Sequence, residues 1–431
     1  MKVRHVNATR RWMIFSIASM LYFIGYFHRV SITVIVEELM REFSASATSV
    51  GLLSSLYFYP YAAMQIPAGL LVDSFGSKKT LTIFCFIASV GTLVFALSSN
   101  LSLAMLGRTL VGLGVSVGFL CTAKLIASWF AARSFASLTG ILVAIGNIGA
   151  LAASAPLALM VTSLGWRFSF CIIAAATFVL TTALWLGVED NPKEVSQRSQ
   201  RLDSSNPRPP RGMSSAAGVW ISFRSRDFWF AAFPPLFFFG SFISLQGLWG
   251  VPYIMQVYSL GKVEASLIVM MVAVGFCIGA PFWGLISDRV VFSRKRVYLA
   301  GMILFSLTWL LFTSSASVES VSHLPLLLFL LGFFFGVMPM SIVMVKELFP
   351  RRIMGAATGS ANAFPFVGAA LYQLLMGYFL DTYGLVAVVE GVRVFSRTAY
   401  QFGFTLCLAS LAIATMMAFF IREPQKARLA S

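Results

Sequence analysis

Long apolar segments alternate with short polar ones along almost the whole chain. Twelve of the apolar segments approach the roughly 20 residues that an α-helix needs to cross the hydrocarbon core of a bilayer. Six precede a polar stretch at residues 189–226 and six follow it. The pattern predicts an all-α membrane protein with twelve transmembrane helices. We expect these helices at residues 12–36, 50–72, 80–98, 102–126, 135–162, 167–188, 228–258, 264–286, 297–317, 323–346, 353–380 and 399–421.

The composition agrees with a membrane protein. Of the 431 residues, 58% are hydrophobic and only 11% are charged, whereas about a quarter of a soluble domain is charged. The five cysteines all fall inside apolar segments without metal-ligand spacing, so we interpret them as small buried hydrophobic residues. The first apolar segment is much longer than the apolar part of a signal peptide. We therefore expect it to be retained as the first helix.

The basic residues lie mainly on one side of the predicted membrane. If the N-terminus is inside, 25 of the 32 Lys and Arg residues fall in cytoplasmic segments, 5 in outer loops and 2 within the spans. Cytoplasmic loops of membrane proteins carry this excess of basic residues. The distribution predicts that both termini are cytoplasmic, and it explains the net charge of +16 without a nucleic-acid partner. We expect the inner membrane of a bacterium as the location.

The two halves of the chain repeat each other. Gly69 and Asp73, at the end of the second predicted helix, recur 215 residues later as Gly284 and Asp288. A weaker echo follows the fourth and tenth predicted helices. A repeat of half the chain length indicates a duplicated six-helix unit. We expect an N-terminal bundle at 1–188, a cytoplasmic linker with little packed structure at 189–226, and a C-terminal bundle at 227–431.

The loop after the second predicted helix resembles the signature of major facilitator superfamily transporters. Residues 69–79 read GLLVDSFGSKK, which fits the pattern G-x-x-x-D-x-x-G-x-[KR]-[KR], and residues 284–296 carry a weaker copy. Arg108-x-x-x-Gly112 in the fourth predicted helix supports the resemblance. It implies two pseudo-symmetric six-helix bundles that move about a central site. It also implies a monomeric secondary transporter in the lipid bilayer, without a cofactor.

The resemblance implies a gating role for this loop. Asp73, and Asp288 in the second copy, would hold the inner end of a neighbouring helix while the cavity opens outward, and release it on inward opening. Gly69 would allow a close helix approach, and Gly76 a tight turn. The basic residues of the loop either contact anionic lipid headgroups or serve only to fix the topology. The candidate gating residues are Gly69, Asp73, Gly76, Lys78, Lys79, Gly284, Asp288 and Arg289.

Arg29 lies inside the first predicted helix, where a charge needs a partner. A guanidinium near the middle of a bilayer costs several kcal/mol unless it is paired. All 16 Asp and Glu residues fall in loops, tails or span ends, so we favour a bound anion or water over a structural ion pair. The helix also resembles helix 1 of the organic-anion branches of the superfamily, the anion:cation symporters and organophosphate antiporters. In those branches an Arg at this place binds substrate carboxylate or phosphate.

Further polar residues in the spans complete the candidate site. Arg108 either lines the same cavity or contributes to helix packing. His28 stands where the anion:cation symporters carry Asp, so it either transfers protons or is a neutral hydrogen-bonding residue. The seventh predicted helix lacks the Arg of sugar-phosphate antiporters, which favours a carboxylate over a phosphate ester. The candidate substrate-binding residues are Arg29, His28, Tyr26, Tyr61, Arg108, Gln246, Trp249 and Asn362.

These features predict import of a small organic anion, coupled to protons or to exchange, and no enzymatic activity. One alternative is an importer of amino acids or other zwitterionic or neutral nutrients, in which Arg29 would bind the carboxylate. A second is a multidrug exporter, although the fifth predicted helix lacks the Gly-Pro motif of that family. A third is a sensor of the same fold that does not transport. The sequence shows no metal cluster, nucleotide loop or nucleophile constellation.

Overall fold

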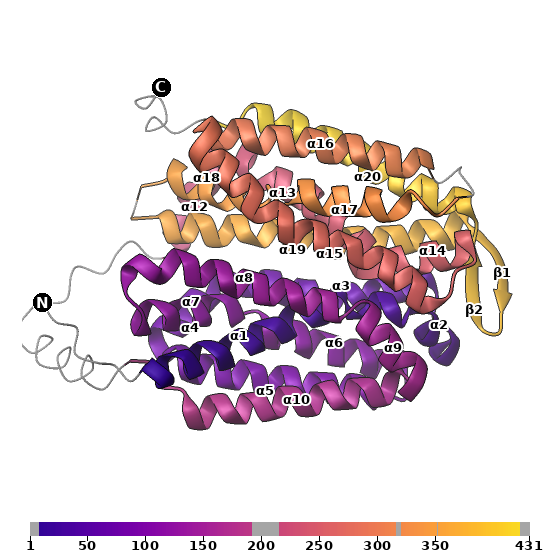
Figure 1. Ribbon diagram of the computed structural model, residues 1–431, viewed down its shortest axis with the longest axis horizontal. Coiled ribbons are helices and arrows are strands. Elements are labelled where there is room, and N and C mark those ends of the chain that lie inside the picture. The colour runs from indigo at the N-terminus through magenta and orange to yellow at the C-terminus, as the bar shows by residue number, and fades with distance from the viewer. Residues whose placement is uncertain (1–7, 192–214, 316–319, 351, 423–431) are drawn as a thin grey trace, which may run out of the picture.

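Two helical bundles lie side by side in the computed structural model, which describes residues 8–191, 215–315, 320–350 and 352–422 (Figure 1). The first half of the chain forms one bundle and the second half forms the other, with most helices running roughly parallel to one long direction. The first helix begins and the last helix ends at the same end of the molecule, which we call the linker end. A β-hairpin marks the opposite end, which we call the hairpin end.

The N-terminal bundle contains ten α-helices and a 3₁₀ turn between its first two helices. They are α1 (Ala8–Val30), η1 (Ser31–Val34), α2 (Val36–Phe43), α3 (Ala47–Met64), α4 (Pro67–Phe75), α5 (Ser77–Ala96), α6 (Leu101–Val115), α7 (Gly118–Trp129), α8 (Phe135–Ala152), α9 (Ala155–Leu164) and α10 (Trp166–Gly187). A short 3₁₀ turn, η2 (Ala132–Ser134), precedes α8.

Within its described residues, the C-terminal bundle contains nine α-helices, two π-helical turns and the hairpin. They are α12 (Ser215–Arg224), α13 (Arg226–Ser244), η3 (Leu245–Trp249), α14 (Gly250–Tyr258), α15 (Lys262–Ile286), η4 (Ser287–Val291), α16 (Arg294–Ser315), α17 (Leu324–Phe335), α18 (Pro339–Leu348), α19 (Met354–Tyr383), β1 (Leu385–Val389), β2 (Val392–Phe395) and α20 (Arg397–Phe419).

Eleven helical segments of the described chain are long and apolar enough to cross a membrane. The predicted span outside this set is 50–72. There the chain forms α3 and the beginning of α4, with Pro67 in the first turn of α4. The membrane protein and its helical fold are confirmed, whereas the count of twelve crossings stays a prediction.

Two segments differ from the sequence analysis. The linker was expected to have little packed structure, but its residues 215–224 form α12, which lies on α19. Gly218 allows this contact, because a Cβ there would lie 2.9 Å from the Ala356 Cβ; residues 192–214 fall outside the described chain. The loop before the last helix contains the antiparallel hairpin β1–β2, so the protein is not entirely α-helical.

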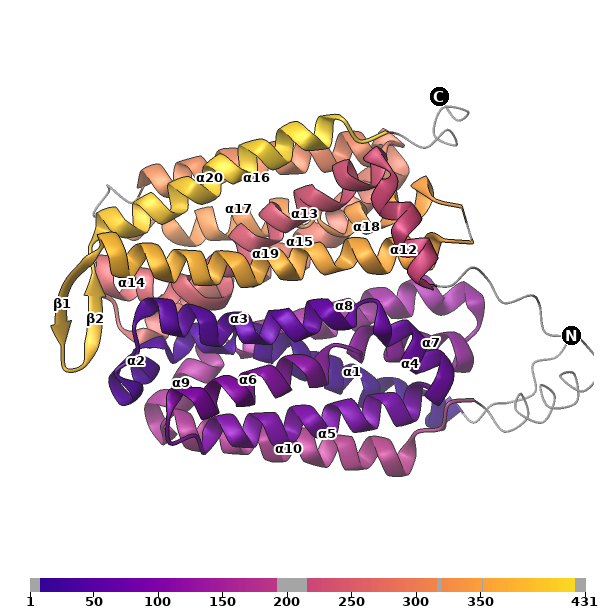
Figure 2. The ribbon, with the colours of Figure 1, turned by 180° about the vertical axis from the view of Figure 1, so that it is seen from behind.

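The two bundles meet along α3 and α19, which run side by side (Figure 2). Small residues permit this close approach. A Cβ on Gly51 of α3 would lie 2.6 Å from the Gln373 carbonyl oxygen, and one on Gly377 of α19 would lie 2.7 Å from the Ala47 carbonyl carbon. This boundary positions the candidate site.

Glycines also permit the crossing of α15 and α17, and substitution there is expected to destabilise the fold. A Cβ on Gly332 would lie 2.9 Å from the Phe276 backbone nitrogen, and one on Gly275 would lie 2.8 Å from the Phe333 nitrogen. Gly332→Leu should therefore lower the free energy of unfolding by roughly 1–3 kcal/mol or more. The neighbouring atoms are backbone atoms, which cannot move aside as readily as a side chain. We expect a lower melting temperature in detergent. Gly355→Ala is the control, since nothing lies within 4 Å of its Cβ position; equal melting of both variants would refute the argument.

Candidate functional site

Arg29 lies near the end of α1, at the boundary between the bundles, and only 7% of it is exposed. Four aromatic rings surround its guanidinium carbon. The ring centroids of Tyr26 and Tyr61 lie at 4.2 and 5.5 Å, and those of Phe239 and Phe366 at 5.9 and 5.3 Å. Cations are attracted to aromatic faces at such distances. We call these four rings, two from each bundle, the aromatic cage.

Aromatic groups surround the charge of Arg29, and no acid of the described part of the chain pairs with it. The Tyr57 and Tyr61 hydroxyls also lie near the guanidinium. Among the described residues, its Nε has no hydrogen-bond partner, and no carboxylate forms an ion pair with it. A buried cation in this situation retains a strong preference for an anion.

His28 and Arg108 lie inside the N-terminal bundle, outside the aromatic cage. His28 is 1% exposed, and its Nε2 is 3.2 Å from the Thr92 hydroxyl of α5, with the Phe170 ring of α10 nearby. The Arg108 Nη1 donates to the His28 carbonyl oxygen at 3.1 Å, and its guanidinium lies 5.0 Å from the Tyr57 ring. Tyr57 thus stands between the two buried arginines.

The other candidate binding residues lie on the C-terminal side of the boundary, and one of them forms a hydrogen bond across it. The Asn362 Nδ2 donates to the Gln65 Oε1 at 2.7 Å, which joins α19 to the end of α3. Trp249 is fully buried, and its indole nitrogen donates to the Gln373 carbonyl oxygen at 3.1 Å. Gln246 is buried in the same π-helical turn, η3. The structure therefore brings Tyr26 and Tyr61 to Arg29, but gives Trp249 a contact within its own bundle.

The two candidate gating acids make ion pairs within their own bundles. The Asp73 carboxylate accepts from the Lys124 Nζ at 2.8 Å. Asp288 lies 3.9 Å from the Arg294 guanidinium, which also pairs with Glu347. Their side chains remain largely exposed. In this structure the ion pair of each acid stays on its own side of the boundary.

The glycines of the two loops have different roles. Gly76 has a φ of +83° and lies directly between α4 and α5, a backbone conformation that favours glycine. The Asp190 carboxylate lies beside it and accepts from the Lys78 backbone nitrogen at 2.7 Å. The expected close helix approach at Gly69 is not seen here, because nothing lies within 4 Å of its Cβ position, and Gly284 is equally open. Lys79 and Arg289 are exposed.

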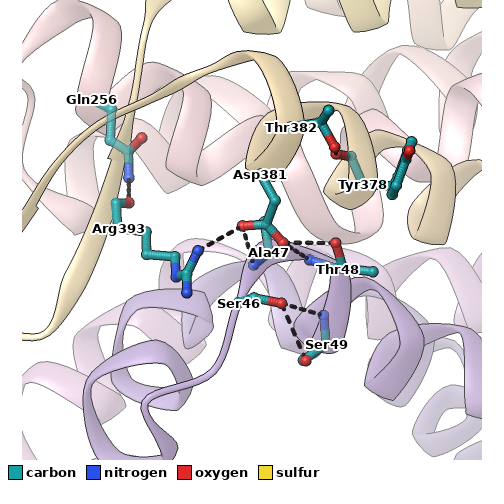
Figure 3. A network of polar contacts seen from close by, with 9 residues as sticks. All are labelled: Ser46, Ala47, Thr48, Ser49, Gln256, Tyr378, Asp381, Thr382 and Arg393. Carbon is teal, nitrogen blue, oxygen red and sulfur yellow. Dashed lines mark hydrogen bonds and ion pairs between the residues drawn. The ribbon is translucent and has the colours of Figure 1, made fainter.

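An acid that the sequence analysis did not single out joins the bundles at the hairpin end. The Asp381 carboxylate, in the last turn of α19, accepts from the Ala47 and Thr48 backbone nitrogens at 3.0 and 2.7 Å (Figure 3). It also accepts from the Thr48 hydroxyl at 2.6 Å and from the Arg393 guanidinium of β2 at 3.2 Å. A carboxylate is favourable at a helix N-terminus, where backbone N–H groups are free. In the sequence, the only indication of this role was the position of Asp381 directly after the predicted span 353–380.

Three further contacts cross the boundary at the hairpin end. They are the hydrogen bond from Thr33 to the Leu248 carbonyl (3.0 Å), the hydrogen bond from Arg41 to the Glu390 carbonyl (3.3 Å), and the ion pair between Lys262 and Glu38. With the Asp381 contacts they join the bundles on one side of Arg29. We call this set the hairpin-end latch.

Comparisons with known proteins agree with this architecture. The family model described as Major Facilitator Superfamily matches residues 15–251 and again 236–431. A Cupriavidus necator protein named probable sulfoacetate transporter SauU is 25% identical, over 88% of this chain and 90% of its own. The Escherichia coli protein named probable galactarate/D-glucarate transporter GarP is 24% identical (86% and 88%), and the E. coli hexuronate transporter is 21% identical (89% and 91%).

Solved structures match the fold over almost the full length. A bacterial homologue of the human lysosomal transporter Spinster superposes with a TM-score of 0.76 at 16% identity, covering 96% of this chain and 97% of its own. The D-xylose–proton symporter superposes with a TM-score of 0.75 at 16% identity, covering 97% and 99%. At these identities the likeness shows the fold alone.

Proposed function

The chain belongs to the major facilitator superfamily, and from this premise we propose that it is a secondary transporter of a small organic anion. The observation that carries the proposal is Arg29, a buried cation at the boundary of the bundles without a carboxylate partner among the described residues. The similar proteins named for sulfoacetate, galactarate and hexuronate support an anionic substrate. The proposed binding residues are Arg29, Tyr26, Tyr61 and Asn362, with Arg108, Gln246 and Trp249 in supporting positions.

In this proposal the substrate anion replaces aromatic faces as the partner of Arg29. A planar guanidinium offers two parallel N–H groups to a carboxylate, which gives a short, directional contact. The Tyr61 hydroxyl lies near the guanidinium and would donate to the same oxygens, whereas the Tyr57 hydroxyl donates to the Gly25 carbonyl oxygen at 2.8 Å. Neutralising the charge in a site shielded from water supplies the driving force for binding.

In alternating access, the contacts at one end of the boundary would break while contacts at the other end form. We assign the hairpin end to the outside and the linker end to the cytoplasm of a bacterial cell, as the basic residues predict. The hairpin-end latch is closed in this structure, so the outward-open state requires it to break. In that state Asp73 and Asp288 would leave the cations of their own bundles and contact the other bundle. We propose that the cycle imports its substrate.

Uptake into proteoliposomes tests the proposal. The purified protein should accumulate a radiolabelled monocarboxylate under an imposed pH gradient or by exchange with a preloaded anion. Selective uptake of an amino acid would favour the zwitterion importer, and uptake of a lipophilic cation would favour the drug exporter. Binding of anions without uptake under any gradient would favour the sensor.

Replacing His28 distinguishes a proton carrier from a hydrogen-bonding residue. His28 is fully buried against Thr92, inside one bundle, so we expect His28→Asn to keep uptake within about threefold of wild type, the change of roughly 0.6 kcal/mol that one altered hydrogen bond in a membrane helix brings. The pH dependence of uptake should not change. The measurement is initial uptake rate between pH 5 and 8, with Thr92→Val as the matched variant. Loss of the pH dependence in His28→Asn alone would assign proton coupling to His28.

A further inference from the structure

The wall of the site on the C-terminal side is built from phenylalanine. Phe239 and Phe366 face the Arg29 guanidinium and lie 5.5 Å apart. Behind them, Phe335 lies 6.0 Å from Phe239 and stacks on Phe242 at 3.7 Å. All four rings are at least nine-tenths buried, so this wall is a continuous apolar surface directly opposite the charge.

Most polar side chains near this wall already have partners. The Ser241 and Ser244 hydroxyls of α13 donate to backbone carbonyl oxygens of their own bundle, at 2.9 and 3.5 Å. The Asn362 amide donates to Gln65. A substrate rich in hydroxyl groups would lose its hydrogen bonds to water here. The Tyr61 hydroxyl and the buried amides of Gln246 and Gln373 could replace only some of them, and sites discriminate strongly on such unpaired groups.

An apolar ring would use the same wall well. Flat rings pack on phenylalanine faces and edges with a gain beyond the area that they bury. The substrate anion would displace the guanidinium from Phe239 and Phe366, and the freed faces of these two rings would then contact the body of the substrate. The site thus combines one fixed cation with one aromatic surface.

We infer that the substrate is a monoanion carrying an apolar ring, such as an aromatic monocarboxylate, and not a polyhydroxylated sugar acid. This inference rests on the proposed function and deepens it. It separates this chain from the similar proteins named for galactarate and hexuronate, whose names denote hydroxyl-rich acids. Phe239 and Phe366 would determine this preference, because these two rings lie against the Arg29 guanidinium and would contact the ring of the substrate.

Phenylacetate and glucuronate are matched probes, since both are monoanions that contain one six-membered ring. Binding to the purified protein in nanodiscs is measured by isothermal titration calorimetry, and uptake by competition in proteoliposomes. We expect phenylacetate to bind at least about tenfold more tightly than glucuronate. Phe366→Leu should weaken phenylacetate binding about tenfold. The control Phe282→Leu, at a lipid-exposed position of α15, should change nothing.

The outcomes separate the inference from the proposed function. Tighter binding of glucuronate, with dependence on Arg29, would overturn the apolar-ring inference and leave the anion transporter standing. Equal effects of Phe366→Leu and Phe282→Leu on phenylacetate binding would also overturn it. The phenylalanine wall would then be part of the protein core and would not contact the substrate. Failure of both probes to bind, or binding unchanged in Arg29→Gln, would overturn the inference and the proposed function together.

Discussion

Arg29→Gln is expected to abolish anion uptake without destabilising the substrate-free protein. Removing the charged partner of a bound carboxylate typically costs at least ~2 kcal/mol, a loss of about 30-fold or more in affinity. The buried guanidinium has no acid partner among the described residues, so its removal also relieves a desolvation cost. We therefore expect an unchanged or higher melting temperature without ligand, and no further rise when the anion is added.

Two variants control this prediction. Arg29→Lys keeps the charge but loses the planar fork, so its affinity should fall between those of wild type and Arg29→Gln. Arg296→Gln removes an exposed arginine of α16 and should behave as wild type. Wild-type uptake by Arg29→Gln would refute a substrate role. A much lower melting temperature without ligand would instead show that Arg29 is structural.

The unpaired charge could be predicted from the sequence, but half of its surroundings could not. Tyr26 lies one turn before Arg29, so helical spacing predicts their contact, and the absence of deep acids is visible in any count. Phe239 and Phe366 follow more than 200 residues later. The chain has 41 phenylalanines, and the sequence does not distinguish these two from the others. Which of them meets Arg29 depends on how the two bundles dock, which local patterns do not encode.

His28 shows how a neighbour in sequence can be misplaced. It was included in the predicted site because it stands next to Arg29, where the anion:cation symporters carry Asp. Adjacent residues of a helix are rotated by about 100° from each other and face different neighbours. The structure accordingly directs His28 to Thr92 and the bundle interior, and Arg29 to the boundary.

The hairpin was missed for a different reason. Residues 385–395 were assigned to an outer loop because they separate two long apolar segments. Yet two β-branched runs flank Glu390 and Gly391, which both have positive φ, at 49° and 80°. A two-residue turn of this kind is typical of a β-hairpin. The signal is local and was present in the sequence.

Asp381→Asn is expected to open the hairpin end of the boundary. The carboxylate caps the first turn of α3 through Ala47 and Thr48 and pairs with Arg393. Asn keeps one acceptor oxygen, so the variant loses the hydrogen bonds of the other oxygen, worth about 1 kcal/mol, and the charge at the helix N-terminus, worth a similar amount. Because the contacts with Ala47 and Thr48 exist only when the bundles are closed at this end, losing ~2 kcal/mol would shift the population about 30-fold towards the outward-open state.

Cysteine accessibility measures this shift. Ser55 of α3 is fully buried against the Ala370 carbonyl oxygen of α19. A Ser55→Cys reporter, in a background where the five native cysteines are replaced, should react slowly with a membrane-impermeant maleimide from outside. Asp381→Asn should accelerate the reaction strongly, whereas Asp288→Asn, the same change at the linker end, should not. Equal acceleration in both variants would indicate general loosening, and no acceleration in Asp381→Asn would show that the other contacts of the hairpin-end latch hold the bundles closed without it.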